Sequence, residues 1–191
     1  PMAEDAKEAT GSMGDDTPLA VLSDKYRPLY HFFRQNFSQV TNPPIDSLRE
    51  NKVMSLKTRF GNLGNILDFD NLTEENIYVL DSPILTNSQF KKFKKFFSKK
   101  IKVIDCTFDI QFSLKKRIEA IREEAETAVR EGSTFLILSD KNISNQKASI
   151  PSILTVGAVH SHLVKHGLRG YCSLNVECSD ALDTHTFAVL I

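Results

Sequence analysis

Apolar residues recur three or four positions apart early in the chain, at Leu29, Phe33, Phe37 and Val40. This period matches one face of an α-helix, so the pattern predicts an amphipathic helix from Pro28. A proline suits the first helical turn, because the backbone N–H group that it lacks would have no partner there. The preceding residues 1–27 are mostly small and polar, and they predict an extended or irregular segment.

A proline-locked turn follows this helix, with the sequence TNPPID at 41–46. Pro43 and Pro44 lack backbone donors and bias the residue before each of them away from helical geometry, so they end the helix. Asp46 then supplies a carboxylate that caps a second helix. This second helix is predicted to end near Gly61 and Gly64 and to carry Leu48, Val53 and Leu56. Residues 28–76 are therefore predicted as a helical pair around the TNPPID turn.

Short apolar runs alternate with helical stripes over residues 77–191. The runs predict strands at IYVLDSP (77–83), IKVIDCTFD (101–109), TFLILSD (134–140) and YCSLNVECS (171–179). The stripes predict one helix with Phe90, Phe93 and Phe97, a second from Ser113 to Gly132, a third at about 149–167, and a fourth begun by DTHTFAVLI (183–191). The third helix is apolar nearly all round, so we expect it to be buried between layers.

Strands alternating with helices predict the α/β class, with parallel strands joined by right-handed crossovers and preceded by the N-terminal helical segment. Four βα units fit either an open doubly wound sheet or an incomplete (βα) barrel, and periodicity alone does not choose between them. The last helix has no stop signal before Ile191, so we expect that it is cut from a longer polypeptide.

Charge and cysteine content restrict the possible partners. The chain has 24 basic and 24 acidic residues, so no net charge draws it to nucleic acid or to an anionic membrane. Cys106, Cys172 and Cys178 are odd in number and lack CxxC spacing, which gives neither a disulfide framework nor a zinc or iron–sulfur ligand set. Neither a signal segment nor an apolar run of ~20 residues occurs. The sequence therefore predicts a soluble, cytoplasmic protein.

The histidines of HSHLVKH are a candidate metal cluster. On a helix, His162 and His166 share a face one turn apart while His160 points elsewhere, so at most two of them can bind one ion together. We expect these rings to pair with backbone or polar neighbours near the helix end instead.

The run KKFKKFFSKK, with Lys102 beyond it, holds seven lysines in twelve residues. The interleaved phenylalanines follow the spacing of a core stripe, so the lysines are expected to be the solvated back of a helix. Nucleic-acid binding would use similar residues, and salt-sensitive binding of generic DNA would support that alternative.

Motifs for catalysis or phosphate binding are absent from the sequence. GNLGN and GSMGD contain glycines but lack the spacing of a phosphate-binding loop. There is no GxSxG motif, and none of the cysteines lies in a recognisable catalytic context. We therefore predict no catalytic, cofactor-binding or metal-binding residue in the chain.

Several blocks of sequence are specific when taken together. They are GSMGDDTPLAVLSD, RPLYHFFRQNFSQVTNPPIDSLRE, VMSLKTRFG, SPIL, ILSD, IPSILTVGAVHSHLV and SDALDTHTFAVL. In this order they resemble the central domain of the large (alpha) subunit of glutamate synthase, over nearly the whole chain. TNPPID is the most discriminating block, because consecutive prolines followed by an acidic cap seldom recur by chance.

The resemblance implies one domain of a large oxidoreductase that makes two glutamates from glutamine and 2-oxoglutarate. In that family an amidotransferase domain releases ammonia, and a barrel domain with FMN and an iron–sulfur cluster reduces the imine formed with 2-oxoglutarate. The central domain is similar to an incomplete FMN barrel and joins the other two. The implied partners are those two domains of the same polypeptide and an electron-donating subunit or ferredoxin, with no nucleic acid and no membrane.

The chain departs from the family pattern at two histidine clusters. Where the family commonly has three successive histidines, this chain has His160, Ser161 and His162. Where the family often has paired histidines in the last helix, this chain has His185 and Thr186. A proton relay or a metal centre depends on each of its histidines, so the replacement of a histidine in each cluster argues against either role.

Ammonia that passes between two sites must avoid protonation in bulk water, which favours a narrow, rigid path with a few hydrogen-bonding groups. The TNPPID turn is a candidate for part of such a path, because its prolines stiffen the backbone. The polar side chains expected to face this interdomain path are Thr41, Asn42, Ser55 and Thr58. An equally weighted alternative is that Thr41 and Asn42 only cap backbone groups at a helix end.

Two other function classes stay open from the residues alone. One is an independent small-molecule-binding α/β domain, with its ligand at the carboxyl ends of the strands near Ser82, Thr107, Ser139 and Ser179. The other is a basic nucleic-acid adaptor. A large exposed apolar surface would favour the connecting domain over both, because a free-standing protein would hide such a surface.

Overall fold

The computed structural model describes residues 19–33, 56–61, 67 and 77–191, and the chain separates into two units, Pro1–Gln39 and Val40–Ile191. In the first unit, two 3₁₀ turns are described, η1 (Ala20–Leu22) and η2 (Leu29–Phe32). The helix predicted from Pro28 therefore starts as a 3₁₀ turn. Its remainder, the TNPPID turn and most of the second predicted helix lie outside the described residues.

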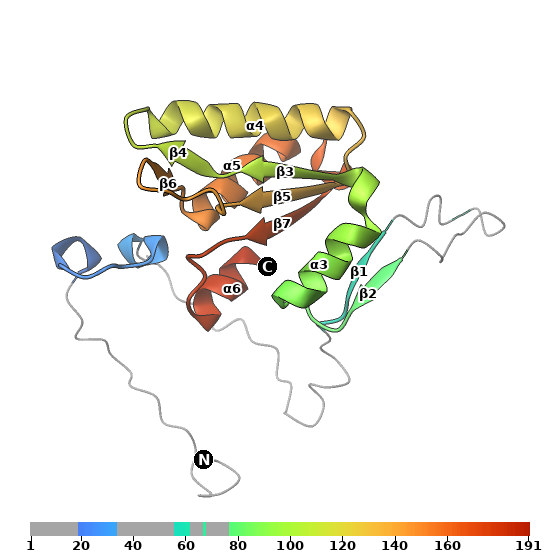
Figure 1. Cartoon of the computed structure of the whole chain (residues 1–191), viewed down its shortest axis with the longest axis horizontal. Coiled ribbons are helices and arrows are strands. Elements are labelled where there is room, and N and C mark those ends of the chain that lie inside the picture. The colour runs from blue at the N-terminus through green and yellow to red at the C-terminus, as the bar shows by residue number, and fades with distance from the viewer. Residues whose placement is uncertain (1–18, 34–55, 62–66, 68–76) are drawn as a thin grey trace, which may run out of the picture. The chain divides into compact units, whose positions relative to one another are not determined.

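A three-stranded parallel sheet is the centre of the second unit. Its strands are β3 (Ile101–Asp105), β5 (Phe135–Ser139) and β7 (Ser173–Glu177), in the order β3-β5-β7. α4 (Leu114–Arg130) lies between β3 and β5 in the chain, and α5 (Ser152–Lys165) lies between β5 and β7, as Figure 1 shows. The α/β class is confirmed, and over the described residues the sheet is open rather than closed into a barrel.

The side chains of β5 divide the core into two halves. Leu136 and Leu138 pack into one cluster with Ile121 and Ala125 of α4 and with Val159 and Leu163 of α5. Phe135 and Ile137 point the other way and pack with Phe90, Phe93 and Phe97, at α3 (Asn87–Phe96) and its end. Successive strand residues face opposite sides, so α4 and α5 cover one face of the sheet and α3 covers the other.

α3 forms where the phenylalanine stripe was predicted. Thr86 caps it in a capping box, because its hydroxyl accepts from the Gln89 amide while the Gln89 side chain accepts from the Thr86 amide. Phe93 is fully buried, with ring centroids 5.1 Å from Phe60 and 5.6 Å from Phe135. Within the helix, four exposed or half-buried lysines form the solvated back, namely Lys91, Lys92, Lys94 and Lys95.

α4 and α5 both end at the glycines that the sequence indicates. Gly132 has φ 94° and Gly167 has φ 68°, in the left-handed region where a side chain is strained. In each case the next residue donates back to a helical carbonyl, from Ser133 to Ala128 at 2.9 Å and from Leu168 to Leu163 at 2.8 Å. These bonds make Schellman motifs, which satisfy carbonyl groups that have no partner inside the helix.

α5 is not buried all round, so that prediction is wrong. Ser152, Thr155, Val159 and Leu163 form its buried face. Leu154 and Val164 are exposed on the opposite side. One face of α5 therefore packs in the core, and apolar residues on the other face are left at the surface.

The strand predicted at 101–109 is divided in two. β3 ends at Asp105, whose side chain accepts bonds from the amide (2.9 Å) and the hydroxyl (2.8 Å) of Thr107. This local turn sends the chain out of the parallel sheet. β4 (Thr107–Asp109) then pairs antiparallel with β6 (Lys147–Ser149).

The region around the strand predicted at 77–83 also differs from the sequence expectation. β2 (Tyr78–Leu80) pairs antiparallel with β1 (Thr58–Phe60) and does not join the parallel sheet. The second predicted helix therefore does not extend to Gly61. β-branched and aromatic residues favour strands, and Phe60 of β1 packs its ring against Phe93, which fixes this small ribbon against α3.

The last helix, α6 (Thr184–Leu190), is capped by Asp183, which accepts from the amide of Thr186 at 2.7 Å. Asp180 caps a different helix, because its carboxylate accepts from the Ser152 amide at 2.8 Å, at the start of α5. Among the helices of the described residues, none is long and apolar enough to cross a membrane.

Replacing Phe93 with alanine is expected to lower the free energy of unfolding by about 3 to 5 kcal/mol, because the change leaves a cavity between α3, β5 and the β1–β2 ribbon. Phe96 is the matched control, since its side chain is 49% exposed while Phe93 is 0% exposed. In urea denaturation, Phe96→Ala should lower the free energy of unfolding by less than half as much as Phe93→Ala does. Equal losses would contradict this account of the core.

Candidate functional site

The carboxyl edge of the parallel sheet is the place where open α/β sheets usually bind ligands. β3, β5 and β7 end there at Asp105, Ser139 and Glu177. Thr107 and Ser179 follow the ends of β3 and β7, so three of the four hydroxyls named from the sequence come to this edge. Ser82 does not, because it follows β2 in the separate ribbon, where its hydroxyl accepts from the Ile84 amide at 3.1 Å.

The hydroxyls at this edge are already hydrogen-bonded to other groups of the protein. Ser139 donates to Glu177 at 3.2 Å, and Thr107 donates to Asp105 at 2.8 Å. The buried carboxylate of Asp140 accepts from the amide and the hydroxyl of Ser179 at 2.7 and 2.6 Å. These bonds join the ends of the strands to one another, which favours a structural role over ligand binding.

The Asp105 carboxylate accepts three hydrogen bonds at the edge, as the Asp140 carboxylate does. Burial alone would raise the pKa of Asp105, but hydrogen bonds from Asn142 and Thr107 together outweigh burial and hold the pKa below its ordinary value. The guanidinium of Arg117 donates to the backbone carbonyls of Asp105 and Thr107. A cavity of about 450 Å³ lies beside these residues, and its lining includes Phe112.

Of the four proposed ammonia-path residues, Thr58 is the one that lies within the part of the chain that the structure describes. Thr41, Asn42 and Ser55 lie outside the described residues. Thr58 lies in β1, opposite Leu80, and not on a helix as the sequence suggested. Its hydroxyl donates to the Leu56 carbonyl at 3.0 Å, and its oxygen keeps lone pairs that can accept a further bond.

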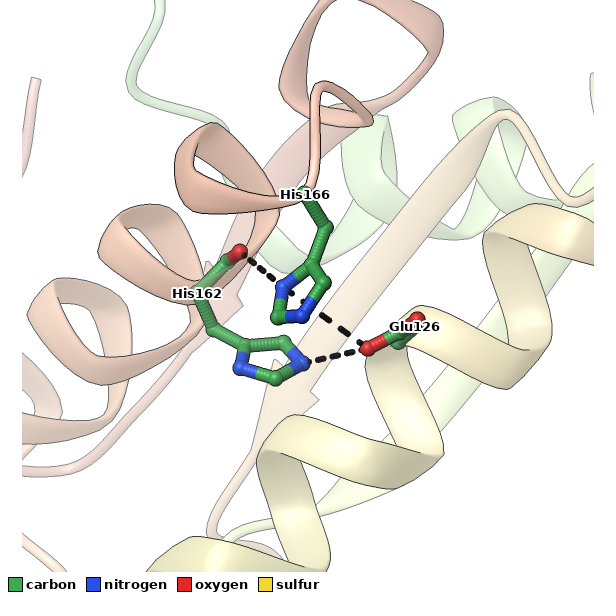
Figure 2. A group of neighbouring side chains, drawn as sticks. All are labelled: Glu126, His162 and His166. Atoms are coloured by element: carbon green, nitrogen blue, oxygen red, sulfur yellow. Dashed lines mark hydrogen bonds and ion pairs between the residues drawn. The ribbon is translucent and has the colours of Figure 1, made fainter.

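Glu126 of α4 and two histidines of α5 form a compact polar cluster (Figure 2). His162 Nε2 lies 2.6 Å from Glu126 Oε2. His166 Nδ1 donates to the backbone carbonyl of His162 at 2.8 Å and lies 3.8 Å from the same carboxylate oxygen. Figure 2 shows both rings turned toward Glu126 across the space between the two helices. Within the described residues, this is the one group of three or more His, Cys, Asp or Glu side chains that could gather around a metal ion.

Neighbouring residues orient this cluster. Arg130 donates to the other oxygen of Glu126, with Nη2 at 2.8 Å and Nε at 2.9 Å from Oε1. The hydrogen bonds from Arg130 and His162 lower the pKa of Glu126, so it is a carboxylate at neutral pH. The expectation that His160 points elsewhere is confirmed, because its Nδ1 accepts from Arg169 at 3.2 Å.

The three cysteines lie in protected positions. Burial raises the pKa of Cys106 and of Cys178 to about 11, and it also raises the pKa of Cys172. Nucleophilic attack and metal ligation both need the thiolate, which a raised pKa disfavours. Cys106 and Cys172 therefore behave as small apolar groups of the core, and Cys178 is partly buried.

Comparison with known proteins adds what the geometry alone does not give. The family model described as the glutamate synthase central domain matches residues 1–191. The chain belongs to this family. The resemblance carried by the TNPPID turn and the other sequence blocks is thereby confirmed.

Proteins similar to this chain include glutamate synthases whose names state different electron donors. The NADPH large chain of Azospirillum brasilense is 56% identical, the chloroplastic ferredoxin-dependent glutamate synthase of Spinacia oleracea is 42% identical, and the NADH glutamate synthase of Schizosaccharomyces pombe is 41% identical. In each case the alignment covers 100% of this chain. The chain spans only 13%, 12% and 9% of the length of these three relatives, respectively.

Replacing Asp140 with alanine is expected to lower the free energy of unfolding by about 2 to 3 kcal/mol, because the amide and hydroxyl of Ser179 lose the buried Asp140 carboxylate as a charged acceptor. Asp109→Ala is the control, since the side chain of Asp109 accepts only an exposed bond from the Gln111 amide. This change should lower the free energy of unfolding by less than about 1 kcal/mol. Denaturation curves of the two variants give the comparison. A cost for Asp140→Ala no greater than the control would contradict a bonding role at the sheet edge.

Alkylation of the cysteines at pH 7.5 is expected to be slow in the folded protein. With a pKa of about 11 for Cys106 and Cys178, the thiolate fraction is roughly a thousandth or less at that pH. Mass spectrometry after iodoacetamide treatment should find these thiols unmodified until denaturant is added. Fast labelling of the native protein would show that a thiolate is present.

Proposed function

We propose that this chain is the connecting domain of a glutamate synthase that converts glutamine and 2-oxoglutarate into two glutamates. In this proposal it links an amidotransferase domain to an FMN and iron–sulfur domain of the same polypeptide, and an electron-donating subunit or ferredoxin supplies the electrons. The observation that carries the proposal is the family match over the whole chain. The same segment aligns over its full length with relatives named for NADPH, NADH and ferredoxin, which supports a role shared by all of them.

The described residues support a connecting role rather than a catalytic one. The hydroxyls and carboxylates at the carboxyl edge bond to each other, and the thiols are protonated at neutral pH. Iron–sulfur clusters need several thiolate ligands close together, and the three cysteines, which form no common ligand group, do not fit that requirement. In this proposal, other domains of the enzyme hold FMN and the cluster.

Exposed apolar side chains support packing against those neighbouring domains. Phe112 is 73% exposed and Ile110 is 62% exposed, in the loop that follows β4. Leu182 and Tyr171 are also strongly exposed, near the two ends of β7. Large exposed apolar groups of this kind are typical of surfaces that another protein covers. We assign the amidotransferase and FMN domains as the occupants.

Channelling of ammonia is the second part of the proposal. Ammonia must reach the second site without meeting bulk water, so the path needs a fixed backbone and a few polar groups. Pro43 and Pro44 restrict the backbone at the turn, and Asp46 can fix the start of the following segment. Thr41, Asn42, Ser55 and Thr58 are the polar side chains that we assign to the path or to the adjoining domain interface. The open acceptor sites of Thr58 are compatible with this assignment.

In the intact enzyme, Asn42→Ala is expected to raise the ratio of glutamine hydrolysed to 2-oxoglutarate consumed above one to one. The reason is that the path would lose a polar contact and part of the ammonia would escape into the medium. Parallel assays of ammonia release and of 2-oxoglutarate consumption measure this ratio. Asn145→Ala, in an exposed turn before β6, is the control and should leave the ratio unchanged.

The two parts of the proposal fail in different ways. An unchanged ratio in Asn42→Ala would leave Asn42 with only a capping role at a helix end. Absence of glutamate formation by the unaltered enzyme, with glutamine, 2-oxoglutarate and a reductant supplied, would contradict the proposed activity itself.

A further inference from the structure

We propose that Glu126, His162 and His166 form a binding site for a divalent transition-metal ion, with Zn²⁺ as the best match, where α4 packs against α5 (Figure 2). Each residue offers one ligand atom, and these atoms all lie within 4.8 Å of one another. The inference is independent of the proposed glutamate synthase activity. It also goes beyond the sequence, which predicts no metal site.

The residue types fit Zn²⁺ better than the other common biological ions. Two imidazoles and one carboxylate are a frequent zinc ligand set, and three protein ligands leave one position for water or for another ligand. Mg²⁺ and Ca²⁺ prefer oxygen ligands, of which this cluster offers only one residue. The three ligands come from two packed helices, so the ion would also crosslink α4 and α5.

The helical scaffold holds these three side chains in place. His162 and His166 are four residues apart, which puts them on one face of α5 with ring centroids 4.2 Å apart. The core contacts on either side fix how the helices pack, with Ala125 and Val129 of α4 beside Val159 and Leu163 of α5. Ligands on rigid elements keep their geometry better than ligands on loops, which favours binding.

Hydrogen bonds outside the cluster prepare two of the ligands for an ion. Because the His162 carbonyl can only accept, Nδ1 of His166 carries the proton of a neutral ring and its Nε2 keeps a free lone pair. Arg130 occupies Oε1 of Glu126, which leaves Oε2 for the ion. Metal-binding histidines commonly donate their second nitrogen to a carbonyl or carboxylate in this way.

His162 needs a proton rearrangement before it can bind. Its Nε2 now donates to Glu126, while its Nδ1 is buried without a hydrogen-bond partner. On metal binding the proton of Nε2 leaves and the neutral ring carries one on Nδ1, so neutral His162 releases no net proton. Zinc binding should weaken at acidic pH, because protons compete with the metal ion for the ligand atoms.

The geometry needs only a small adjustment to hold an ion. Ligand atoms around a tetrahedral Zn²⁺ lie roughly 3.3 Å apart, given metal–ligand distances of about 2.0 Å. The 2.6 Å contact between His162 Nε2 and Glu126 Oε2 must open by about 0.7 Å, and ligand atoms that now lie as much as 4.8 Å apart must approach by up to about 1.5 Å. Side-chain rotation supplies movements of this size without moving the helices.

The exposed fractions rise across the cluster, from 11% for His162 through 21% for Glu126 to 35% for His166. An ion can therefore reach the cluster from the His166 side, where water can complete its coordination. The replacement of a family histidine by Ser161 does not touch this group. Ser161 is exposed, and both His162 and His166 are present.

Equilibrium dialysis of the full-length protein against Zn²⁺, followed by elemental analysis, tests the proposal. The unaltered protein should bind one equivalent of Zn²⁺ with micromolar affinity or better. His166→Ala should bind no Zn²⁺ at this site or bind it at least tenfold more weakly. Glu126→Gln should show the same loss, because the amide carries no negative charge. His160→Ala is the matched control, since His160 lies on the same helix, bonds to Arg169 and should leave zinc binding unchanged.

Thermal unfolding gives a second readout that does not depend on activity. Zn²⁺ should raise the melting temperature of the unaltered protein and of His160→Ala, but not that of His166→Ala, because an ion that binds only the folded state stabilises it. His166 is partly exposed, so its replacement should leave the fold intact, which circular dichroism checks. Equal zinc binding by all variants, or no saturable binding below about 100 μM by the unaltered protein, would overturn the proposal and leave a hydrogen-bonded cluster only.

Discussion

The burial of β5 on both faces is the constraint on which the rest of the structure depends. Phe135 and Ile137 hold α3 through the phenylalanine cluster, while Leu136 and Leu138 hold α4 and α5. A shift of one residue in register would exchange these two sets, placing aromatic rings where the aliphatic core lies. The pairing of β5 with β3 on one side and β7 on the other therefore fixes the position of every helix around the sheet and of the residues those helices carry.

Long periodic patterns were the part of the fold that the sequence could predict. The stripe on α4 runs for 17 residues and ends at a glycine with positive φ, so both its type and its end could be read from the sequence. The failures lie in short segments. β1 and β2 have three residues each. The sequence of residues 77–83 does not indicate that this strand pairs with an antiparallel strand some twenty residues earlier in the chain. Likewise, the break after β3 depends on one side-chain turn at Asp105.

The candidate cluster was predictable only in part, for a different physical reason. Helical period alone places His162 and His166 on one face and turns His160 away, and the structure agrees. Glu126 could not be selected in this way, because α4 also carries Glu119, Glu123 and Glu124. Which of these acids meets the histidines depends on how α4 packs against α5, and that is set by apolar contacts elsewhere. A tertiary arrangement, rather than a sequence motif, makes the cluster.

Stability alone does not explain why an imidazole occupies position 162. The hydrogen bond to Glu126 stabilises His162, while leaving its buried Nδ1 without a partner costs free energy of comparable size, so the two effects offset each other. A leucine at the same position, beside Leu163 and Val159, would contribute about 1.5 to 3 kcal/mol through burial of its side chain. Natural sequences tend to depart from such packing rules where function requires it. A nearly buried histidine without net stabilising value, one helical turn from a solvent-accessible second histidine, therefore marks a position held for binding rather than for packing.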